Sequence, residues 1–452
     1  MMGSTTKIPS PPPVPTKFYE DMSTEEINKA LNIPVGLVNL GNTCYFNATL
    51  QCMKASKELK EAISKPQTAQ ISTATTNPSD KLQKNLLESV KQVFSSMDTT
   101  DQEAISPVKL LSSLQALYPQ FAEREQSGMA YKQQDAEECW NVIMNTLAAQ
   151  LKVEGGSKNL IDSYFGGEMV TTYKCKEAPD EMETTKVDAF RKLDCRIDKS
   201  VLYLQQGLKL SLNQTIEKHS ETLNKDVEYI ASSQISRLPK YLTVNYLRFF
   251  WKTKESVEAK VVKRVVFPTE LDLGEFVTSD LMEKMAPLRS YFKNAAVEEE
   301  TQKKRARLEI QKENDRQLNI QRERVDTPPS RSGSPGLTSA STTDCNALIH
   351  PSLKSDIGCN PSGFYELVAV LTHIGRNANS GHYIAWVRHE NDPVTGSNQI
   401  QGASPPSGTS HWWYKFDDNN VSIVSENDIK KLEGGGDWHT AYITLYKAKD
   451  LA

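Results

Sequence analysis

The 452-residue sequence lacks any apolar run of the roughly 18 to 20 residues that a membrane-spanning helix needs. Its first segment, MMGSTTKIPSPPPVPTKF, lacks the apolar core of a signal peptide. Cysteine is scarce and scattered, with seven residues, which argues against a disulfide framework and favours a reducing compartment, the cytoplasm or the nucleus. The net charge of -4 gives no reason to expect nucleic acid or an anionic membrane as a partner. We therefore expect a monomeric globular protein.

The composition and the spacing of apolar residues change along the chain. Residues 1–33 are rich in proline and polar residues and are predicted to be a mobile N-terminal segment. From Pro34 to about Leu151 apolar residues recur at helical spacing, and after Ile161 short runs rich in β-branched and aromatic residues predict strands. The predicted helices include residues 47–56, 81–97, 107–121 and 133–151, and the predicted strands include residues 165–175, 192–197, 241–251, 259–268 and 364–374.

Two stretches interrupt the strand region. Residues 293–358 begin with a densely charged segment and continue with a segment rich in Pro, Ser, Gly and Thr, so we expect an insertion that is partly helical and partly disordered. A smaller insertion is predicted at about 391–411.

The stretch GLVNLGNTCYFNATLQC surrounds one cysteine with the neighbours that a reactive thiol needs. Gly41 and Asn42 permit a tight turn, Thr43 or Asn42 can cap a helix, and the helix would begin near Cys44. The free amides and the dipole of a helix N-terminus favour a thiolate and can stabilise an oxyanion. Asn39 is a candidate side-chain donor to that oxyanion. The alternative is that Cys44 is a small buried hydrophobic residue, the commonest role of a free cysteine.

His382, in NSGHYIAWVRHE, starts a predicted strand and is the candidate general base. If that strand pairs with the next one, Asp417 can reach the far nitrogen of His382, and Asp418 would face a polar network near the oxyanion. The alternative for this DDNN segment is a plain turn. His439 is the one serious rival base, but it lacks a downstream carboxylate on a paired strand. The histidines interpreted as surface or satisfied polar residues are His373, His389, His411 and His439.

Together these segments resemble the ubiquitin-specific protease family of cysteine deubiquitinases. The matching segments, in family order, are GLVNLGNTCYFNATLQC, YKQQDAEECW, FGGEMVTTYKC, RLPKYLTVNYLRF, and SGHYIAWV followed by WWYKFDDNNVSIV and AYITLY. The resemblance implies an α+β fold, the papain-like cysteine protease hand with a helical thumb, a mixed palm and antiparallel β fingers. It implies a catalytic domain over residues 34–449, interrupted by the two insertions. By position, it implies that Cys44 is the nucleophile, His382 the base, Asp417 the orienting acid and Asn39 the oxyanion donor.

The resemblance also implies contacts with substrate. Asp135 matches the residue that hydrogen bonds to the backbone of the ubiquitin tail, and Gln134 and Glu138 would lie beside it. The alternative for Asp135, which precedes an amphipathic helix, is a helix N-cap. Tyr383 matches a residue that lines a narrow channel for the two C-terminal glycines of ubiquitin, where the lack of space excludes side chains. Asp418 is a further candidate for substrate binding.

No metal or other cofactor is expected. Many members of the family bind a structural zinc in the fingers through four cysteines. In this sequence the corresponding region contains only Cys175 and Cys195, each without a neighbouring cysteine, whereas tetrahedral zinc needs four ligands.

Segments such as LPKYLTVNYLRFFWKTKESVEAKVVKRVVFP and EGGGDWHTAYITLY are similar to the proteasome-associated branch of the family. This similarity implies that the chain trims ubiquitin chains at the 26S proteasome and regulates degradation. Docking on the regulatory particle is expected to be weakened, because the ubiquitin-like domain that begins this branch is missing from the sequence. Loops at about 250–260 and 374–381 would cover the channel until the proteasome binds, so we expect low activity from the isolated chain. The alternative is that they are ordinary hairpin connections.

The predicted function is thiol-dependent hydrolysis of the isopeptide or peptide bond after the C-terminal glycine of ubiquitin. The expected partners are ubiquitin, polyubiquitin conjugates and the 26S proteasome. A rival function is a ubiquitin-binding regulator that works by occupancy, although the presence of Cys44, His382 and Asp417 argues against a dead enzyme. A papain-like or transglutaminase-like enzyme would also use these residue types, but it would not explain the QQDAEE segment.

Overall fold

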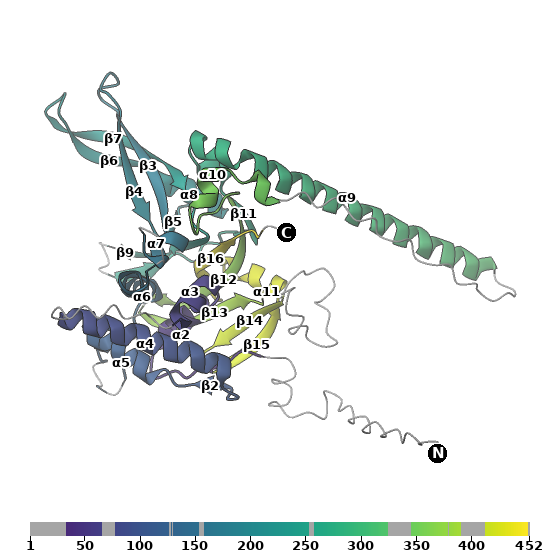
Figure 1. The fold of residues 1–452 in the computed structure, drawn as a ribbon, viewed down its shortest axis with the longest axis horizontal. Helices are drawn as coiled ribbons and strands as arrows, with labels where there is room; N and C mark the ends of the chain where they lie inside the picture. The colour runs from purple at the N-terminus through teal and green to yellow at the C-terminus, as the bar shows by residue number, and fades with distance from the viewer. Residues whose placement is uncertain are drawn as a thin grey trace, which may run out of the picture.

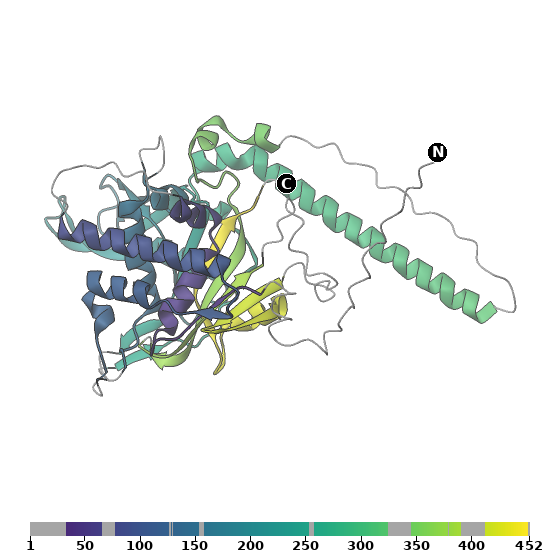
Figure 2. The ribbon, with the colours of Figure 1, turned by 60° about the horizontal axis from the view of Figure 1, so that its bottom comes forward.

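A computed structural model shows a thumb, a palm and fingers around a central sheet (Figures 1 and 2). The structure describes residues 33–65, 77–125, 128, 130–152, 158–252, 257–323, 345–377, 379–389 and 412–450. Residues 1–32 of the predicted mobile segment and the whole of the predicted insertion at 391–411 lie outside these ranges. Within the described ranges, every helix is too short or too polar to cross a lipid bilayer.

The thumb is a lobe of helices from the first part of the chain, at the lower left of Figure 1. Its helices are α2 (Cys44–Lys54), α3 (Lys57–Ser64), α4 (Pro78–Thr99), α5 (Val108–Leu117), α6 (Ala136–Gln150) and α7 (Leu160–Tyr164). The four helices predicted from periodicity are confirmed by α2, α4, α5 and α6. In α6 the predicted apolar face is buried, because its side chains join the core that α2 and α4 share.

The palm is a mixed sheet in the order β15-β14-β13-β12-β16-β8-β5, with β11 paired to β12. Its strands are β5 (Leu193–Arg196), β8 (Tyr241–Leu247), β11 (Glu270–Asp272), β12 (Phe364–Asn377), β13 (Ser380–Arg388), β14 (Trp412–Asp417), β15 (Asn420–Ser425) and β16 (Thr440–Ala448). The central strands β8, β12 and β16 are buried along almost their whole length, because one apolar core lies on each face of the sheet. Helix α2 packs against the β12–β13 side, so the N-terminus of α2 lies next to the start of β13.

The fingers are an antiparallel sheet in the order β4-β3-β7-β6, which extends to the upper left of Figure 1. Its strands are β3 (Gly167–Cys175), β4 (Thr184–Phe190), β6 (Asn213–Ser220) and β7 (Lys225–Arg237). Cys175 is buried in a small finger core with Val227 and Tyr229, whereas Cys195 is on β5 in the palm core. The two cysteines therefore lie in different sheets, and the molecule has the α+β hand that the sequence predicted.

The remaining elements are short connections and one long helix. They are β1 (Gly36–Leu37), β2 (Ala104–Ile105), β9 (Phe249–Lys252), β10 (Val257–Lys260), α8 (Leu204–Leu212), α9 (Ser279–Glu323), α10 (Pro351–Ser355) and α11 (Glu426–Lys430). Helix α9 projects away from the body in both views (Figures 1 and 2). Residues 293–323 of the predicted insertion form its distal part, and residues 324–344 lie outside the described ranges.

The strand predicted at residues 259–268 is wrong beyond Lys260. Carbonyl groups of this segment face the guanidinium of Arg248 instead of a neighbouring strand, with Nη1 donating to the carbonyls of Val261 (2.9 Å) and Lys263 (2.9 Å). Arg248 is fully buried, and its Nε also donates to the carbonyl of Ala441 (2.7 Å). A periodic β-branched pattern cannot reveal this arrangement, because the competing donor comes from another part of the chain.

Candidate active site

Cys44 is the first residue of α2 and is almost completely buried. The turn before it contains two consecutive residues with left-handed backbone, Gly41 (φ 98°) and Asn42 (φ 55°), as the Gly-Asn pair predicted. The side chain of Asn42 holds this turn, because its Nδ2 donates to Glu125 Oε1 (2.8 Å) and to the carbonyl of Tyr131 (2.9 Å). The thiol therefore lies at the positive end of a helix dipole.

The prediction that Thr43 or Asn42 caps this helix is confirmed for the position of Thr43, but not for a capping hydrogen bond. Thr43 is the N-cap residue, but its side chain makes no capping hydrogen bond, and its Oγ1 instead accepts from the amide of Leu40 (2.8 Å). Among the described residues, the backbone N–H of Cys44 has no hydrogen-bond acceptor. An uncapped first turn leaves this amide available to an oxyanion that forms at the sulfur.

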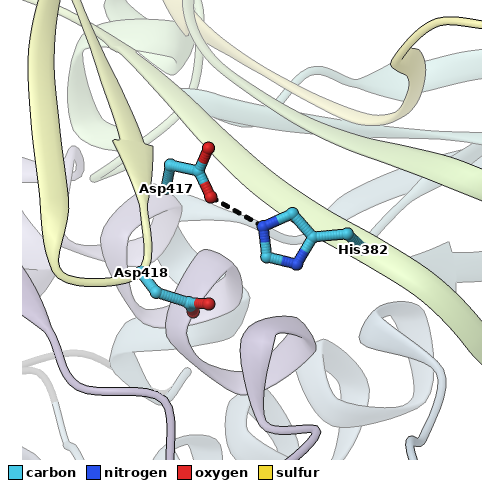
Figure 3. Close-up of side chains that lie close together, drawn as sticks. All are labelled: His382, Asp417 and Asp418. Atoms are coloured by element: carbon cyan, nitrogen blue, oxygen red, sulfur yellow. Dashed lines mark hydrogen bonds and ion pairs between the residues drawn. The ribbon is translucent and has the colours of Figure 1, made fainter.

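His382 lies at the start of β13 and contacts residues from two directions. Strands β13 and β14 pair in antiparallel register, which brings Asp417 Oδ1 to 2.7 Å from His382 Nε2 (Figure 3). The side chain of Cys44 also lies close enough to His382 to raise the pKa of the imidazole. Because Nε2 faces the carboxylate, Nδ1 is the nitrogen that remains for the sulfur. Three side chains from distant parts of the sequence thus form a continuous Cys–His–Asp chain.

The charges in this chain favour a protonated imidazole. Hydrogen bonding to Asp417, and then to Cys44, raises the pKa of His382 to about 10 despite its partial burial. The hydrogen bond with His382 is the main reason that the pKa of Asp417 falls to about 2, and Lys415, whose Nζ lies 3.1 Å from Asp417 Oδ2, adds to the effect. An imidazolium beside a sulfur stabilises the thiolate, which is the nucleophilic form of cysteine.

A second polar network joins Asn39 to the turn between β14 and β15. Asp418 Oδ2 accepts from Asn39 Nδ2 (2.8 Å), and Asp418 Oδ1 accepts from Asn47 Nδ2 (2.8 Å). Asn39 is exposed, and its Oδ1 accepts from the amides of Gly41 (3.0 Å) and Thr43 (3.1 Å). Among the described residues, the second amide hydrogen of Asn39 has no acceptor and is available to another group.

Sequence reasoning missed Asn47, which is 2% exposed and lies one helical turn after Cys44. Its Nδ2 also donates to the carbonyls of Leu37 (3.2 Å) and Val38 (3.3 Å). The signal was its spacing of three residues from Cys44, which places both side chains on one side of the helix.

Two further histidines near His382 are buried and neutral. Burial lowers the pKa of His439 to about 4, and the charge of His382, whose ring centroid is 6.3 Å away, lowers it further. Burial and the charge of Lys260 lower the pKa of His373 to about 3. Neither has a carboxylate partner among the described residues, so neither is placed to act as the oriented base. His389 packs against Tyr414, with ring centroids 5.3 Å apart, and His411 lies outside the described residues.

Asp135 is both the N-cap of α6 and a partner of the palm. Its Oδ1 accepts from the amide of Glu137 (2.6 Å), which is the helix-cap alternative, and both its oxygens accept from the hydroxyl of Tyr442. Gln134 is buried, and its Nε2 donates to the carbonyl of Gln120 (3.0 Å). Glu138 accepts from Gln120 Nε2 (3.3 Å). Both flanking residues thus hold the thumb together, and Asp135 is the one of the three that contacts the palm.

Tyr383 is buried in an aromatic cluster rather than exposed along a groove. The cluster is made by Phe249, His373, Tyr383 and Tyr442, with ring centroids 4.5 Å apart for His373 and Tyr383 and 5.2 Å apart for Phe249 and Tyr442. Its four members come from β9, β12, β13 and β16, so the cluster joins four strands beside His382.

The two loops predicted to flank the channel meet at His373. Lys260, at the end of the β9–β10 hairpin, places Nζ 3.0 Å from His373 Nδ1 and donates to the carbonyl of His373 (2.7 Å). His373 Nε2 lies 3.0 Å from the carbonyl of Ser380, in the turn between β12 and β13. The tips at residues 253–256 and 378 lie outside the described residues.

His382, Asp417 and Asp418 each place one potential metal-ligand atom within 4.8 Å of the others (Figure 3). Each carboxylate already has protein donors. Asp417 accepts from His382 and from Lys415 (3.1 Å), and Asp418 accepts from two asparagine amides. These hydrogen bonds account for the grouping, and we assign no metal to it.

Comparison with known proteins agrees with this geometry. Residues 35–446 match the family described as ubiquitin carboxyl-terminal hydrolase. The chain is 37% identical to ubiquitin carboxyl-terminal hydrolase 6 of Schizosaccharomyces pombe, with 100% of this chain and 85% of the relative aligned. It is 35% identical to hydrolase 6 of Arabidopsis thaliana (99% and 85% aligned) and 34% identical to hydrolase 14 of Caenorhabditis elegans (99% and 80% aligned). The chain therefore belongs to the ubiquitin carboxyl-terminal hydrolase family and is a cysteine-type ubiquitinyl hydrolase.

Proposed function

We propose that Cys44 attacks the carbonyl carbon of the last glycine of ubiquitin, with His382 as acid and base and Asp417 as its orienting group. One observation carries this assignment: the imidazole of His382 hydrogen bonds to Asp417 (2.7 Å), and the nearby Cys44 side chain raises the pKa of the same imidazole. The Cys44 amide and the free amide hydrogen of Asn39 are available to the oxyanion.

The proposed reaction has two halves. The Cys44 thiolate forms a thioester with ubiquitin, and His382 gives its proton to the departing lysine amine or α-amine. His382, now neutral, then takes a proton from water as the water attacks the thioester. The products are ubiquitin with a free carboxylate and a regenerated thiolate–imidazolium pair.

The assignment is tested by labelling with ubiquitin that carries a C-terminal electrophile. The parent chain is expected to form a covalent adduct, and Cys44→Ala is expected to form none. Cys52→Ala is the matched control, because Cys52 is a buried cysteine of the same helix and burial raises the pKa of its thiol. An adduct that survives in Cys44→Ala would place the nucleophile elsewhere.

We further propose that the chain trims ubiquitin from conjugates at the 26S proteasome, in the cytoplasm and the nucleus. The support is the similarity of its palm segments to the proteasome-associated branch and the contacts that two hairpins make with His373. Hydrolysis of a fluorogenic ubiquitin C-terminal amide is expected to be slow for the isolated chain and faster with proteasomes. Equal rates would argue against the proteasome role. Fluorescence of a tagged chain in cells tests its location.

A ubiquitin-binding regulator remains the second candidate, because occupancy does not require turnover. It is separated from catalysis by Cys44→Ala, which should keep its affinity for ubiquitin while losing hydrolysis. Effects on degradation that persist with this variant would favour a role through binding.

A further inference from the structure

Tyr442 makes a direct bond between palm and thumb. It lies on β16, and its hydroxyl donates to Asp135 at the start of α6, at 2.9 Å from Oδ1 and 2.7 Å from Oδ2. The two residues are far apart in sequence and belong to different lobes. Tyr442 is 5% exposed, so this bond is shielded from solvent on the tyrosine side.

The hydrogen bonds at Asp135 leave part of its carboxylate unused. Oδ1 accepts from both the amide of Glu137 (2.6 Å) and Tyr442, Oδ2 accepts from Tyr442, and the nearby amide of Glu138 also stabilises the charged carboxylate. A carboxylate offers about four acceptor directions, so these three donors leave room for one more. Asp135 is partly exposed, and a donor arriving from solvent can therefore reach it.

The position of the Tyr442 hydroxyl is determined by the aromatic cluster. The ring lies edge-to-face with Phe249 (5.2 Å between centroids) and 6.2 Å from Tyr383, the residue after His382. A buried ring in close packing has little freedom to rotate away. Tyr442 thus places Asp135 at a set distance from the strand that carries His382.

We propose that Tyr442 is a positioning residue for the substrate, because its hydroxyl holds Asp135 so that Oδ2 accepts a backbone N–H of the extended ubiquitin tail. This inference rests on the proposed function and deepens it. Backbone recognition at this point suits a tail that reaches Cys44 in an extended form, because amide hydrogens are present whatever the side chain.

The pKa of Asp135 depends on the hydroxyl of Tyr442. Burial raises the pKa of Asp135 to about 6, and the hydrogen bond from Tyr442 opposes that rise. The other groups that face Asp135 and Tyr442 are Glu137, Glu138 and Cys139 on α6 and Tyr383 on β13. Glu137 also pairs with Lys192. Removing the Tyr442 hydroxyl removes a donor to the charged carboxylate, so the carboxylate should then ionise only at higher pH.

The test compares Tyr442→Phe with Tyr446→Phe, using a fluorogenic ubiquitin C-terminal amide from about pH 5 to about pH 9. Tyr446 lies on the same strand and donates to the carbonyl of Pro268 (2.9 Å). Tyr446→Phe therefore also removes a buried tyrosine hydroxyl, but one that does not bond to Asp135. Tyr442→Phe is expected to raise KM roughly tenfold, to change kcat by less than about twofold, and to move the acid limb of 1/KM to higher pH. Tyr446→Phe is expected to leave both KM and that limb unchanged.

A second variant, Asp135→Asn, tests whether Tyr442 acts through Asp135 or contributes to the stability of the fold in general. Asp135→Asn should raise KM and abolish the acid limb near pH 6, and adding Tyr442→Phe should then have no further effect on KM. An unchanged KM and pH profile in Tyr442→Phe would overturn the inference. The inference would also be overturned if Tyr442→Phe raised KM by the same factor in the Asp135→Asn background as in the parent chain. A parent chain that hydrolyses no ubiquitin substrate would instead overturn the proposed function.

Discussion

His373 and His382 lie on neighbouring strands of one sheet, yet their surroundings are opposite. His382 is about one-third exposed and has a carboxylate and a thiol as partners, so its pKa rises to about 10. His373 is fully buried and faces the ammonium of Lys260, so its pKa falls to about 3. Partner charge and burial, rather than place in the sheet, decide which imidazole carries a proton. Both histidines lie at the same end of the β12–β13 pair, where His373 pairs with Tyr383 and Ile374 pairs with His382, yet one is suited to acid–base chemistry and the other to holding two hairpins.

The largest expected effect comes from removing the charged histidine. His382→Asn should lower kcat/KM for a fluorogenic ubiquitin amide by roughly 10³- to 10⁴-fold, because both the thiolate partner and the proton donor are lost. His389→Asn, at the far end of β13, is the matched control and should retain nearly full activity. Comparable losses in both variants would mean that the effect is not specific to the Cys–His–Asp chain.

Asp417→Asn should have a smaller effect, a loss of roughly 10²-fold or more in kcat, because the amide orients the imidazole poorly and carries no charge. The hydrogen bond that His382 donates to Asp417 is the main reason for the high pKa of His382, so its loss should lower that pKa. The alkaline limb of the pH–rate profile should therefore move from about pH 10 toward neutrality. An alkaline limb that stays in place would contradict the role given to Asp417.

The buried histidines should make the fold sensitive to acid. His373 and His439 stay neutral in the folded state down to about pH 3 and pH 4, whereas the unfolded chain protonates them near pH 6.5. The unfolded state thus binds more protons below about pH 6.5, and each pH unit costs about 1.4 kcal/mol per histidine. Urea unfolding between about pH 6.5 and pH 4.5 should show this slope, and His373→Gln should reduce it. A slope unchanged by that substitution would contradict the neutral state of His373.

The smallest effect is expected at Lys260. Lys260→Met removes the bond between the β9–β10 hairpin and His373, so the hairpin should loosen and the activity of the isolated chain should rise by less than about fivefold. Lys263→Met is the control, because Lys263 lies in the adjoining segment and donates to the carbonyls of Asp198 and Lys199. A fall in activity specific to Lys260→Met would show that the hairpin supports catalysis rather than limiting access.

Sequence periodicity predicted the elements that bury one clear apolar face. The predicted face of α6 is buried, and the strands at residues 165–175, 192–197, 241–251 and 364–374 are present. The prediction of a strand failed at residues 259–268, where the buried guanidinium of Arg248 donates hydrogen bonds to the carbonyls of Val261 and Lys263. Periodicity also passed over β4 and β6, which lie in the thin finger sheet, where most side chains are exposed and no apolar alternation marks a strand.

The sequence predicted those residues of the candidate site whose role follows from their type and from the turn or strand in which they lie. His382 pairs with Asp417 and lies near Cys44, as their motifs suggested, and Asn39 pairs with Asp418. Asn47 and Tyr442 were missed because their importance lies in one partner each from a distant segment, Asp418 and Asp135. The spacing of Asn47 from Cys44 indicates a shared side of the helix but not the partner Asp418, and a tyrosine in a strand carries no local signal of its partner.

The most direct test of the opposite charge states is NMR titration of the histidine Cε1 groups, assigned with His382→Asn and His373→Gln. At pH 7 the His382 signal should be that of an imidazolium, with a midpoint near pH 10, and the His373 signal that of a neutral ring. A neutral His382 at pH 7, or a His373 that titrates near pH 6.5, would contradict this account.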